Sequence, residues 1–240
     1  MKKVNILIGI PTPERVHVVF ALDNLPLIIA YTKKNLKNLG NLFITHQTGI
    51  RTDRNRNIIL RRVIEQKKVD YILWLDSDML YPIDIICKYM QVKFDVMGCL
   101  YFKKPPPHDP VVYIRNKTSA TKPFAALHPS GIKENTIYTV DGIGFGGMMV
   151  NMKVYEALGR KKWMHYGKNF HLPYDAKDRL THDLQFCEDV QKAGFKIALH
   201  GSVRAGHITD TAIDEEMFNI RQGKLAKANV EVIVKDKKKK

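Results

Sequence analysis

One short stretch constrains this chain more than any other: a nearly uninterrupted apolar run that ends in two carboxylates. The run is Val69-Asp70-Tyr71-Ile72-Leu73-Trp74-Leu75, and Asp76-Ser77-Asp78 follows it at once. An apolar, β-rich segment of this length predicts a buried strand. Carboxylates at the end of such a strand lie where α/β sheets hold ligands. Because Mg²⁺ and Mn²⁺ bind one or two carboxylates together with phosphate oxygens, the motif predicts a metal site, against the alternative of a turn or cap.

The order of the expected elements predicts an α/β fold. Strands are expected at residues 4–10, 41–45, 69–75, 94–102, 136–140 and 195–199. Helices are expected after the N-caps Thr52-Asp53, from a first-turn Pro82, at residues 150–158, and at 183–192 with Gly194 as C-cap. This order favours a mostly parallel sheet with helices on both faces. Residues 105–131 and 161–181 are expected to be irregular.

Length and composition indicate a single folded domain. The chain has 240 residues, 45% of them hydrophobic, which is enough for one sizeable core. We expect this domain at residues 1–210, and a helical extension with a disordered lysine-rich tail at 211–240. The basic start is expected to be a buried strand rather than a signal peptide. No apolar run is long enough to span a membrane, and the three scattered cysteines predict reduced thiols in a cytoplasm.

The strongest compositional anomaly is a formal net charge of +15. Such a charge favours polyanionic partners: nucleotide diphosphates, nucleic acid, or anionic lipid and glycan surfaces. The alternative is a generally lysine-rich chain whose basic side chains are simply solvated. Charge governs association rather than fold, so both interpretations stay open.

Five segments follow one another in an informative order. They are Arg56-Asn57, the strand with Asp76-Ser77-Asp78, the glycine-rich residues 141–150, residues 181–197 with Phe186-Cys187 and Ala193-Gly194, and Ala205-Gly206-His207-Ile208. Together they resemble the motifs of GT-A-fold glycosyltransferases, close to an inverting family with many viral and bacterial members. The resemblance covers roughly residues 4 to 210, and it rests on the order of the motifs more than on any single one.

The resemblance implies a fold and an activity. The fold would be a single GT-A-like, Rossmann-like domain with a mostly parallel sheet. The activity would be metal-dependent, inverting transfer of a sugar, as in hexosyltransferases, from a nucleotide-sugar donor, most simply a UDP-sugar. The acceptor would be a hydroxyl of a glycan or another molecule. The viral members are compatible with a virus-encoded protein in a host cytoplasm.

The resemblance also implies roles for seven residues. The nucleotide would be bound by Thr12, Arg56, Asn57 and Asp76. Asp183 would be the general base. Asp78 and His207 would be ligands of Mn²⁺ or Mg²⁺. His200 is the competing histidine, and a structural role is favoured for it.

One departure from the family pattern concerns its Glu-Asp pair. The matching positions here are His182-Asp183, whereas a literal Glu188-Asp189 comes six residues later. Register with Phe186-Cys187 favours Asp183 as the base. Glu188 and Asp189 are then expected to form a polar patch that faces solvent.

Three further features have competing interpretations. Gly142 to Gly147 satisfy G-x-G-x-x-G, but they lie past the middle of the chain, so we reject a dinucleotide site and expect the glycines to let a sugar approach the backbone. Aromatic and histidine residues of the second irregular stretch either stack on sugars or pack the loop; they are Trp163, His165, Tyr166 and His171. Arg15, Lys103 and Lys104 are candidates for the diphosphate, or are solvated.

Two other function classes remain as alternatives. A sugar-nucleotide nucleotidyltransferase would need an N-terminal glycine-rich phosphate loop, which residues 8–13 do not supply. A basic nucleic-acid-binding protein without catalysis would show salt-dependent binding and no donor turnover. The two ideas merge if modified DNA is the polyanionic acceptor of the sugar.

Overall fold

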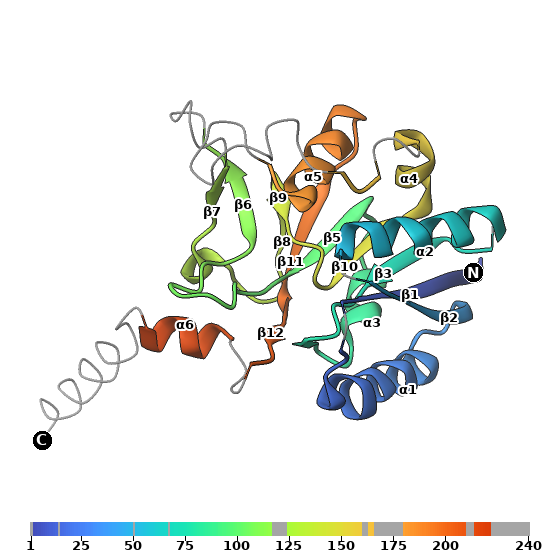
Figure 1. The fold of residues 1–240 in the computed structure, drawn as a ribbon, viewed down its shortest axis with the longest axis horizontal. Coiled ribbons are helices and arrows are strands. Elements are labelled where there is room, and N and C mark those ends of the chain that lie inside the picture. Colours follow the sequence, from blue (N-terminus) through green and yellow to red (C-terminus); the bar gives the residue numbers. More distant parts are fainter. Residues whose placement is uncertain are drawn as a thin grey trace, which may run out of the picture.

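A seven-stranded sheet forms the centre of the molecule (Figure 1). The computed structural model describes residues 2–13, 15–49, 51–66, 68–116, 124–159, 163–165, 180–209 and 214–221. The strand order is β2-β1-β3-β10-β5-β11-β8. These strands are β1 (Val4–Thr12), β2 (Leu39–Thr48), β3 (Tyr71–Trp74), β5 (Val96–Leu100), β8 (Ile137–Thr139), β10 (Met148–Asn151) and β11 (Ile197–Arg204). Strands β2, β1, β3, β5 and β11 run in one direction, so the sheet is mostly parallel, as predicted.

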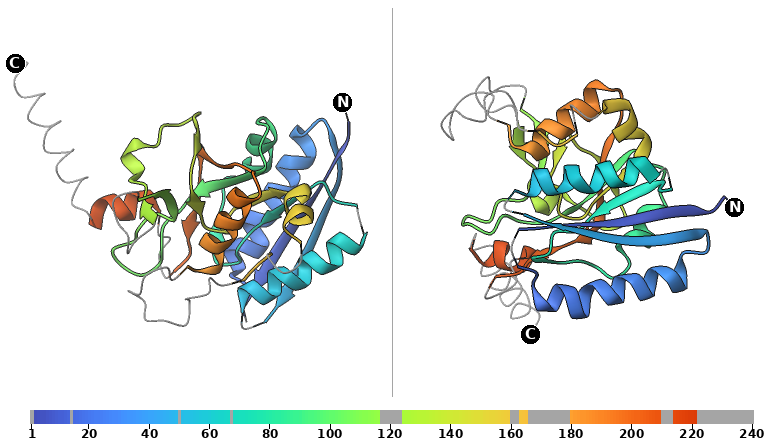
Figure 2. Two further views of the ribbon diagram at one scale, coloured as in Figure 1. Left: turned by 90° about the horizontal axis from the view of Figure 1, so that it is seen from above. Right: turned by 45° about the vertical axis from the view of Figure 1, so that its right-hand side comes forward.

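Helices cover both faces of this sheet (Figure 2). The helices are η1 (Val19–Asn24, a π-helical segment), α1 (Leu25–Asn35), α2 (Thr52–Gln66), α3 (Ile85–Met90), η2 (Pro129–Gly131, a 3-10 turn), α4 (Met152–Leu158), α5 (His182–Lys192) and α6 (Glu215–Arg221). Buried residues of α2, α4 and α5 belong to one hydrophobic cluster, and those of α1 and α3 to a second. None of the described helices is long and apolar enough to cross a bilayer.

The alternation along β3 explains these two clusters. Ile72 and Trp74 lie in the cluster with α2, α4 and α5, whereas Leu73 and Leu75 lie in the cluster with α1 and α3. All four side chains are fully buried. A strand covered on both faces needs apolar residues at every position. The continuous apolar run before Asp76 is therefore the signature of a central strand.

Strand β10 was not predicted. The helix expected at residues 150–158 begins only at Met152, where the Asn151 side chain caps it by accepting from the Lys153 backbone N–H at 3.1 Å. Val150 instead lies in β10, antiparallel between β3 and β5. A short apolar run fits a strand or a helix equally well. Here the run forms a strand because it pairs with both β3 and β5.

Three other expectations about elements are corrected. Pro82 does not start a helix, because α3 begins at Ile85 after a turn in which the Ile85 N–H donates to the Pro82 carbonyl. The helical segment formed by η1 and α1 was not predicted. The first irregular stretch contains β6 (Val112–Arg115) and β7 (Phe124–Ala126), which form a small sheet with β9 (Gly142–Ile143).

Helix α6 packs onto the domain. Phe218 is 4% exposed and stacks on Phe102 at a centroid distance of 5.1 Å. Arg204 of β11 pairs with Glu215. The lysine-rich tail expected beyond residue 234 lies outside the described residues.

Candidate functional site at the carboxyl edge of the sheet

The Asp76-Ser77-Asp78 motif leaves the sheet directly after β3. The Tyr81 hydroxyl accepts a hydrogen bond from the Asp76 backbone N–H at 2.8 Å, which holds the turn after the strand. The motif then enters β4 (Met79–Leu80). Thr12 is the last residue of the neighbouring strand β1. Thr12 and Asp76 therefore lie at the same edge of the sheet. This edge is where ligands bind in open α/β sheets.

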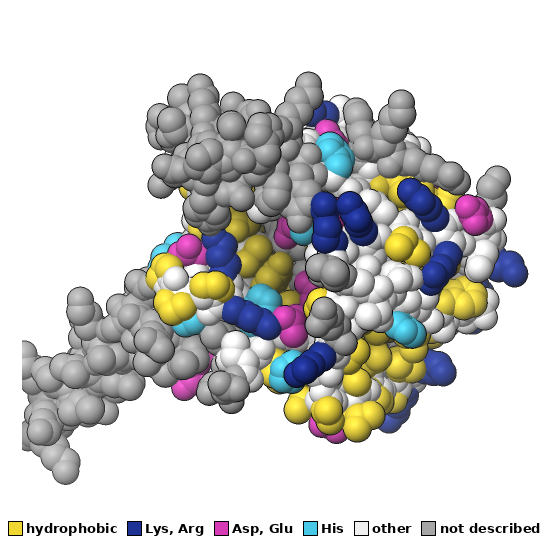
Figure 3. Space-filling model, in the orientation of Figure 1, with side chains coloured by type: hydrophobic (Ala, Val, Ile, Leu, Met, Phe, Trp, Pro, Cys, Tyr) yellow, Lys and Arg dark blue, Asp and Glu magenta, His cyan; other side chains and the backbone are white. Residues whose placement is uncertain are grey.

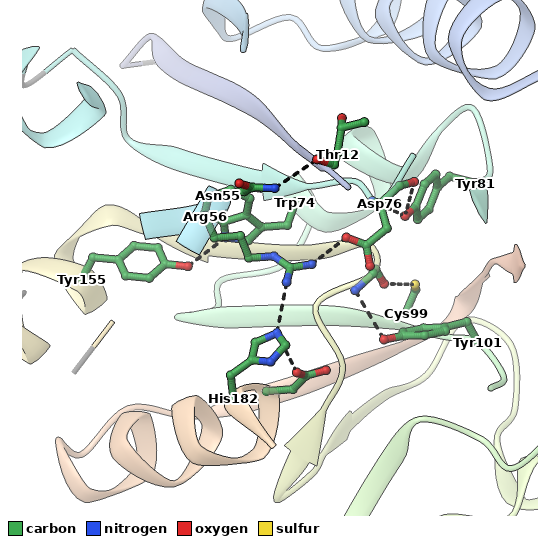
Figure 4. A network of polar contacts seen from close by, with 12 residues as sticks. Thr12, Asn55, Arg56, Trp74, Asp76, Tyr81, Cys99, Tyr101, Tyr155 and His182 are labelled. Atoms are coloured by element: carbon green, nitrogen blue, oxygen red, sulfur yellow. Dashed lines mark hydrogen bonds and ion pairs between the residues drawn. The ribbon is translucent and has the colours of Figure 1, made fainter. Parts of the chain in front are cut away.

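A buried ionic network joins three elements at this edge (Figure 4). Arg56 of α2 is 2% exposed, and its guanidinium donates to Asp76 Oδ1 at 2.6 Å. A second nitrogen of Arg56 lies 3.2 Å from Nε2 of His182, the first residue of α5. His182 Nε2 is in turn 3.0 Å from Asp183 Oδ1. Two predicted residues far apart in sequence, Arg56 and Asp183, are therefore linked through His182.

Aromatic rings support the same network. The Arg56 guanidinium lies 4.7 Å from the centre of the Phe145 ring. The His182 ring stacks on the same Phe145, with an interplanar angle of 11°. Cation–π contact and stacking restrict both polar groups to one orientation. Phe145 belongs to the glycine-rich segment, which thus shapes the site with its aromatic residue.

The pKa values of the two carboxyl groups in this network, Asp76 and Asp183, are shifted in opposite directions. Burial raises the pKa of Asp76, and the nearby Asp78 and Asp183 charges add to this, while Arg56 opposes it. Burial would also raise the pKa of Asp183, but its contacts with His182 and the Arg56 charge outweigh burial and lower it to about 2. The N-terminus of α5 further favours the anion. Asp183 is therefore an ionised carboxylate at neutral pH, as a general base must be.

A short two-stranded ladder places the backbones of Asp78 and His207 at neighbouring positions of two paired segments. Strand β12 (Gly206–His207) pairs with β4, and the Ile208 N–H donates to the Asp78 carbonyl at 2.8 Å. The His207 Nδ1 contacts the Phe102 carbonyl oxygen, and a carbonyl can only accept. Nδ1 therefore carries a proton at this contact, and in the neutral ring the lone pair would be on Nε2, the arrangement found in metal-binding histidines.

The donor set at Asp78 and His207 fits a divalent cation completed by phosphate. The Asp78 side chain is 40% exposed and forms an ion pair with Lys104. Among the described residues, no three His, Cys, Asp or Glu side chains are grouped to hold a metal by themselves. Carboxylate plus imidazole suits Mn²⁺ better than Mg²⁺, and phosphate oxygens of a nucleotide would complete the coordination.

Tyr101 is a site residue that the sequence did not indicate. Its ring meets the His207 ring edge-on at 5.4 Å, and its hydroxyl accepts from the Gly146 N–H at 3.4 Å. Burial raises the pKa of Tyr101 well above its usual value, and the nearby charges of Asp183 and Asp76 add to this shift. A tyrosine directly after strand β5 is not distinctive in sequence, so only the fold identifies it.

Two buried hydroxyls at this edge have no partner among the described residues. The oxygens Thr12 Oγ1 and Ser77 Oγ belong to side chains that are each 2% exposed. The Arg56 Nε is in the same state. Buried polar atoms are seldom left unpaired in folded proteins, so these three atoms are suited to pair with a polar ligand at the sheet edge.

Asn57 does not join the network. Its amide donates to the Met164 carbonyl at 2.9 Å and its oxygen accepts from the Met164 N–H at 3.2 Å. It therefore anchors residues 163–165 to α2. Trp163 is 3% exposed, and its indole donates to the Tyr155 carbonyl, so it packs the loop. Tyr166 and His171 lie outside the described residues.

The expectation that Glu188 and Asp189 face solvent is wrong. Asp189 is 6% exposed and lies 2.8 Å from His165 Nε2. The Glu188 side chain is 15% exposed and pairs with Arg115 and Lys192. Helix α5 is covered by the loop at residues 163–165 and by β6, which the sequence pattern of α5 alone does not reveal. His200 is buried in β11 and accepts from the Ser202 N–H, a structural arrangement.

The glycines of the G-x-G-x-x-G segment admit protein side chains. A Cβ on Gly144 would lie 1.8 Å from the Tyr101 hydroxyl, and one on Gly146 would lie 2.6 Å from the Met79 sulfur. Gly147 adopts a φ of +80°. The space beside these glycines, which we expected a sugar to occupy, is thus filled by protein side chains from β4 and from the end of β5. Figure 3 shows a hollow on this face of the molecule in which acidic, basic and histidine side chains gather.

The fold is a single α/β domain with a mostly parallel sheet, and solved structures of other proteins are similar to it. A197 from STIV has a similar fold, with a TM-score of 0.57 at 17% identity over 89% of this chain and 91% of that one. GalNAc-T7 with UDP, GalNAc and Mn²⁺ gives 0.47 at 10% identity, over 87% of this chain and 44% of the other. Drosophila beta1,4galactosyltransferase 7 with xylobiose gives 0.44 at 13%, over 86% and 67%. No family model and no curated protein sequence matches the chain.

The similarity to A197 from STIV confirms the predicted fold class, an α/β domain with a mostly parallel sheet. The comparisons do not support a DNA acceptor.

Proposed function

We propose that this protein transfers a sugar from a nucleotide-sugar donor to an acceptor hydroxyl with inversion at the anomeric carbon. The observation that carries the proposal is that a half-buried Asp78, the neighbouring His207 of the β4–β12 ladder and an ionised Asp183 lie at one sheet edge. Asp78 and His207 suit the binding of a metal ion and a diphosphate. Asp183 suits the removal of a proton from an alcohol.

Each residue has a defined task in this proposal. The unpaired Thr12 and Ser77 hydroxyls and the Arg56 side chain bind the donor, most simply a UDP-sugar. Asp78 and His207 hold Mn²⁺ or Mg²⁺. A bound divalent cation supplies neutralisation of the charge on the diphosphate. Lys104, paired with Asp78, is close enough to add a second positive charge on the same phosphates.

Asp183 is the general base of the proposed reaction. The acceptor oxygen attacks the anomeric carbon, its proton passes to the Asp183 carboxylate, and the bond from carbon to the diphosphate oxygen breaks. The electron pair of that bond leaves with the nucleoside diphosphate. His182 and Arg56 orient Asp183 and keep it ionised before the proton arrives.

A donor-binding assay tests the proposal. We expect UDP-sugars to raise the melting temperature in the presence of Mn²⁺ and to be hydrolysed slowly to UDP. Asp78→Asn should lower the metal-dependent shift and the hydrolysis at least about tenfold, because it removes a charged ligand. Asp109→Asn, which alters an exposed carboxylate paired with Lys103 on the neighbouring loop, is the matched control and should behave as wild type.

The products distinguish the competing functions. A nucleotidyltransferase would consume a nucleoside triphosphate and release pyrophosphate, whereas sugar transfer releases a nucleoside diphosphate. A binding protein for nucleic acid would shift DNA and turn over no donor. Turnover of the donor at full rate after EDTA treatment would contradict the metal assignment.

A further inference from the structure

The first helical segment carries an exposed apolar patch on its outer side. Nine large hydrophobic residues are exposed in the described part of the chain, and five of them lie between residues 16 and 27. These five, called here the apolar patch, are Val16, Val18, Val19, Leu22 and Leu27, with exposed fractions of 43%, 65%, 44%, 70% and 54%. Figure 3 shows hydrophobic side chains gathered over the lower part of the molecule, where Figure 1 places α1.

The patch is not a by-product of the core. The inward face of η1 and α1 is formed by Phe20, Asn24, Ile28 and Thr32, spaced four residues apart and all buried. A surface helix that has already buried one apolar face normally presents polar residues on the other. Leu22 and Leu27 break this rule, and contiguous apolar groups in water mark an interaction surface.

Basic residues flank the patch. Lys33, Lys34 and Lys37 are exposed at the end of α1 and just beyond it, and Arg15 is exposed before the patch. The sequence from 14 to 37 contains these four cations and two acidic residues, Glu14 and Asp23, and the whole chain carries a net charge of +15. The partner that this combination fits is therefore both apolar and anionic.

We propose that the apolar patch docks onto an anionic lipid bilayer. The helical segment would lie in the plane of the interface, with Leu22 and Leu27 among the acyl chains and the lysines against the headgroups, as interfacial helices do. A symmetric contact between two copies of the chain would bring the like charges of Lys33 and Lys34 together, which disfavours self-association at this face.

The patch is attached to the rim of the candidate site. The His17 N–H donates to the Ser77 carbonyl at 3.1 Å, which ties the loop before η1 to the Asp76-Ser77-Asp78 motif. A docked molecule therefore holds the carboxyl edge of its sheet near the bilayer surface. Docking itself does not depend on the proposed catalysis, and it is measured without it.

Vesicle co-sedimentation of the full chain tests the proposal. The protein should bind vesicles of phosphatidylcholine mixed with phosphatidylglycerol much more strongly than vesicles of phosphatidylcholine alone. Leu22→Ser/Leu27→Ser should lower the partition coefficient about tenfold or more, because two apolar groups no longer enter the membrane. Lys33→Gln/Lys34→Gln should lower it by about fivefold for each lysine removed. All four residues are exposed, so circular dichroism should show unchanged folding.

Ile114→Ser/Ile137→Ser is the matched control, because it removes two exposed isoleucines (41% and 38%) from β6 and β8 and should leave vesicle binding unchanged. The lysine-rich C-terminal sequence is common to every variant and cannot account for a difference between them. Equal loss in the control variant, or no binding of the wild type to the mixed vesicles, would overturn the proposal. So would a dimer in sedimentation velocity that the Leu22/Leu27 variant abolishes while vesicle binding stays the same.

Discussion

At the scale of the residue, Arg56 organises the candidate site. Its buried guanidinium contacts Asp76 and His182 and lies over Phe145. A buried cation is stable only when it is paired, so each of these contacts is a requirement of burial as well as a feature of the site. The planar fork of arginine meets two partners at once, which the ammonium of lysine would not do.

The acidic residues of α5 give a test at the same scale. Asp183→Asn should leave donor binding intact and lower kcat roughly a hundredfold or more, because the amide cannot take the acceptor proton. Asp189→Asn should keep kcat within about threefold and lower the free energy of unfolding by about 1 kcal/mol, because its charge holds His165. Single-turnover rates and denaturant unfolding of both variants provide the comparison. An inactive Asp189→Asn beside an active Asp183→Asn would show that the base lies nearly two turns further along the helix.

At the scale of the element, the turn between β9 and β10 is shaped by the residues that follow β5. Gly144 and Gly146 leave room for Tyr101 and Met79, which lie under the site. The turn therefore determines where Tyr101 can stand, and Tyr101 in turn contacts the His207 ring. Packing of a glycine turn and positioning of a metal-binding histidine are coupled through one tyrosine.

Gly144→Ala tests this coupling. The new methyl group would overlap the Tyr101 hydroxyl, so the variant should lose about 2–3 kcal/mol of unfolding free energy and bind the donor more weakly. Gly131→Ala is the control, because a Cβ there meets nothing within 4 Å, and its stability should change by less than about 0.5 kcal/mol. Thermal unfolding and donor titration measure both effects. A stable Gly144→Ala with normal donor binding would mean that Tyr101 can move freely.

At the scale of the whole molecule, α6 is expected to unfold together with the sheet. Phe218→Ala removes the ring that stacks on Phe102 and should lower the free energy of unfolding by about 2–3 kcal/mol in a single transition. Glu216→Ala, on the exposed side of the same helix, should have little effect. Calorimetry distinguishes the cases, since an unchanged main transition in Phe218→Ala would mean that α6 folds apart from the domain.

Sequence patterns predicted the elements whose burial is the same at every residue. Strand β3 is buried on both faces, so its apolar run was visible without any partner. Strand β10 and helix α1 were missed because their residues are apolar on more than one side, and neither a period of two nor one of 3.6 stands out. Asp189 was misplaced for a related reason: its burial comes from residues 163–165, which are remote in sequence.

Local sequence alone determined that the carboxylates of Asp76 and Asp78 lie together at the end of a central strand. The reason is that these residues follow the strand directly along the covalent chain. It also determined the charge of the chain and the order of the motifs. Only the tertiary structure decided that Arg56 meets Asp76 and His182, that Lys104 pairs with Asp78, and that Leu22 and Leu27 are exposed. These contacts join segments separated by tens of residues, and their free energies depend on distances that only the packed sheet and its helices establish.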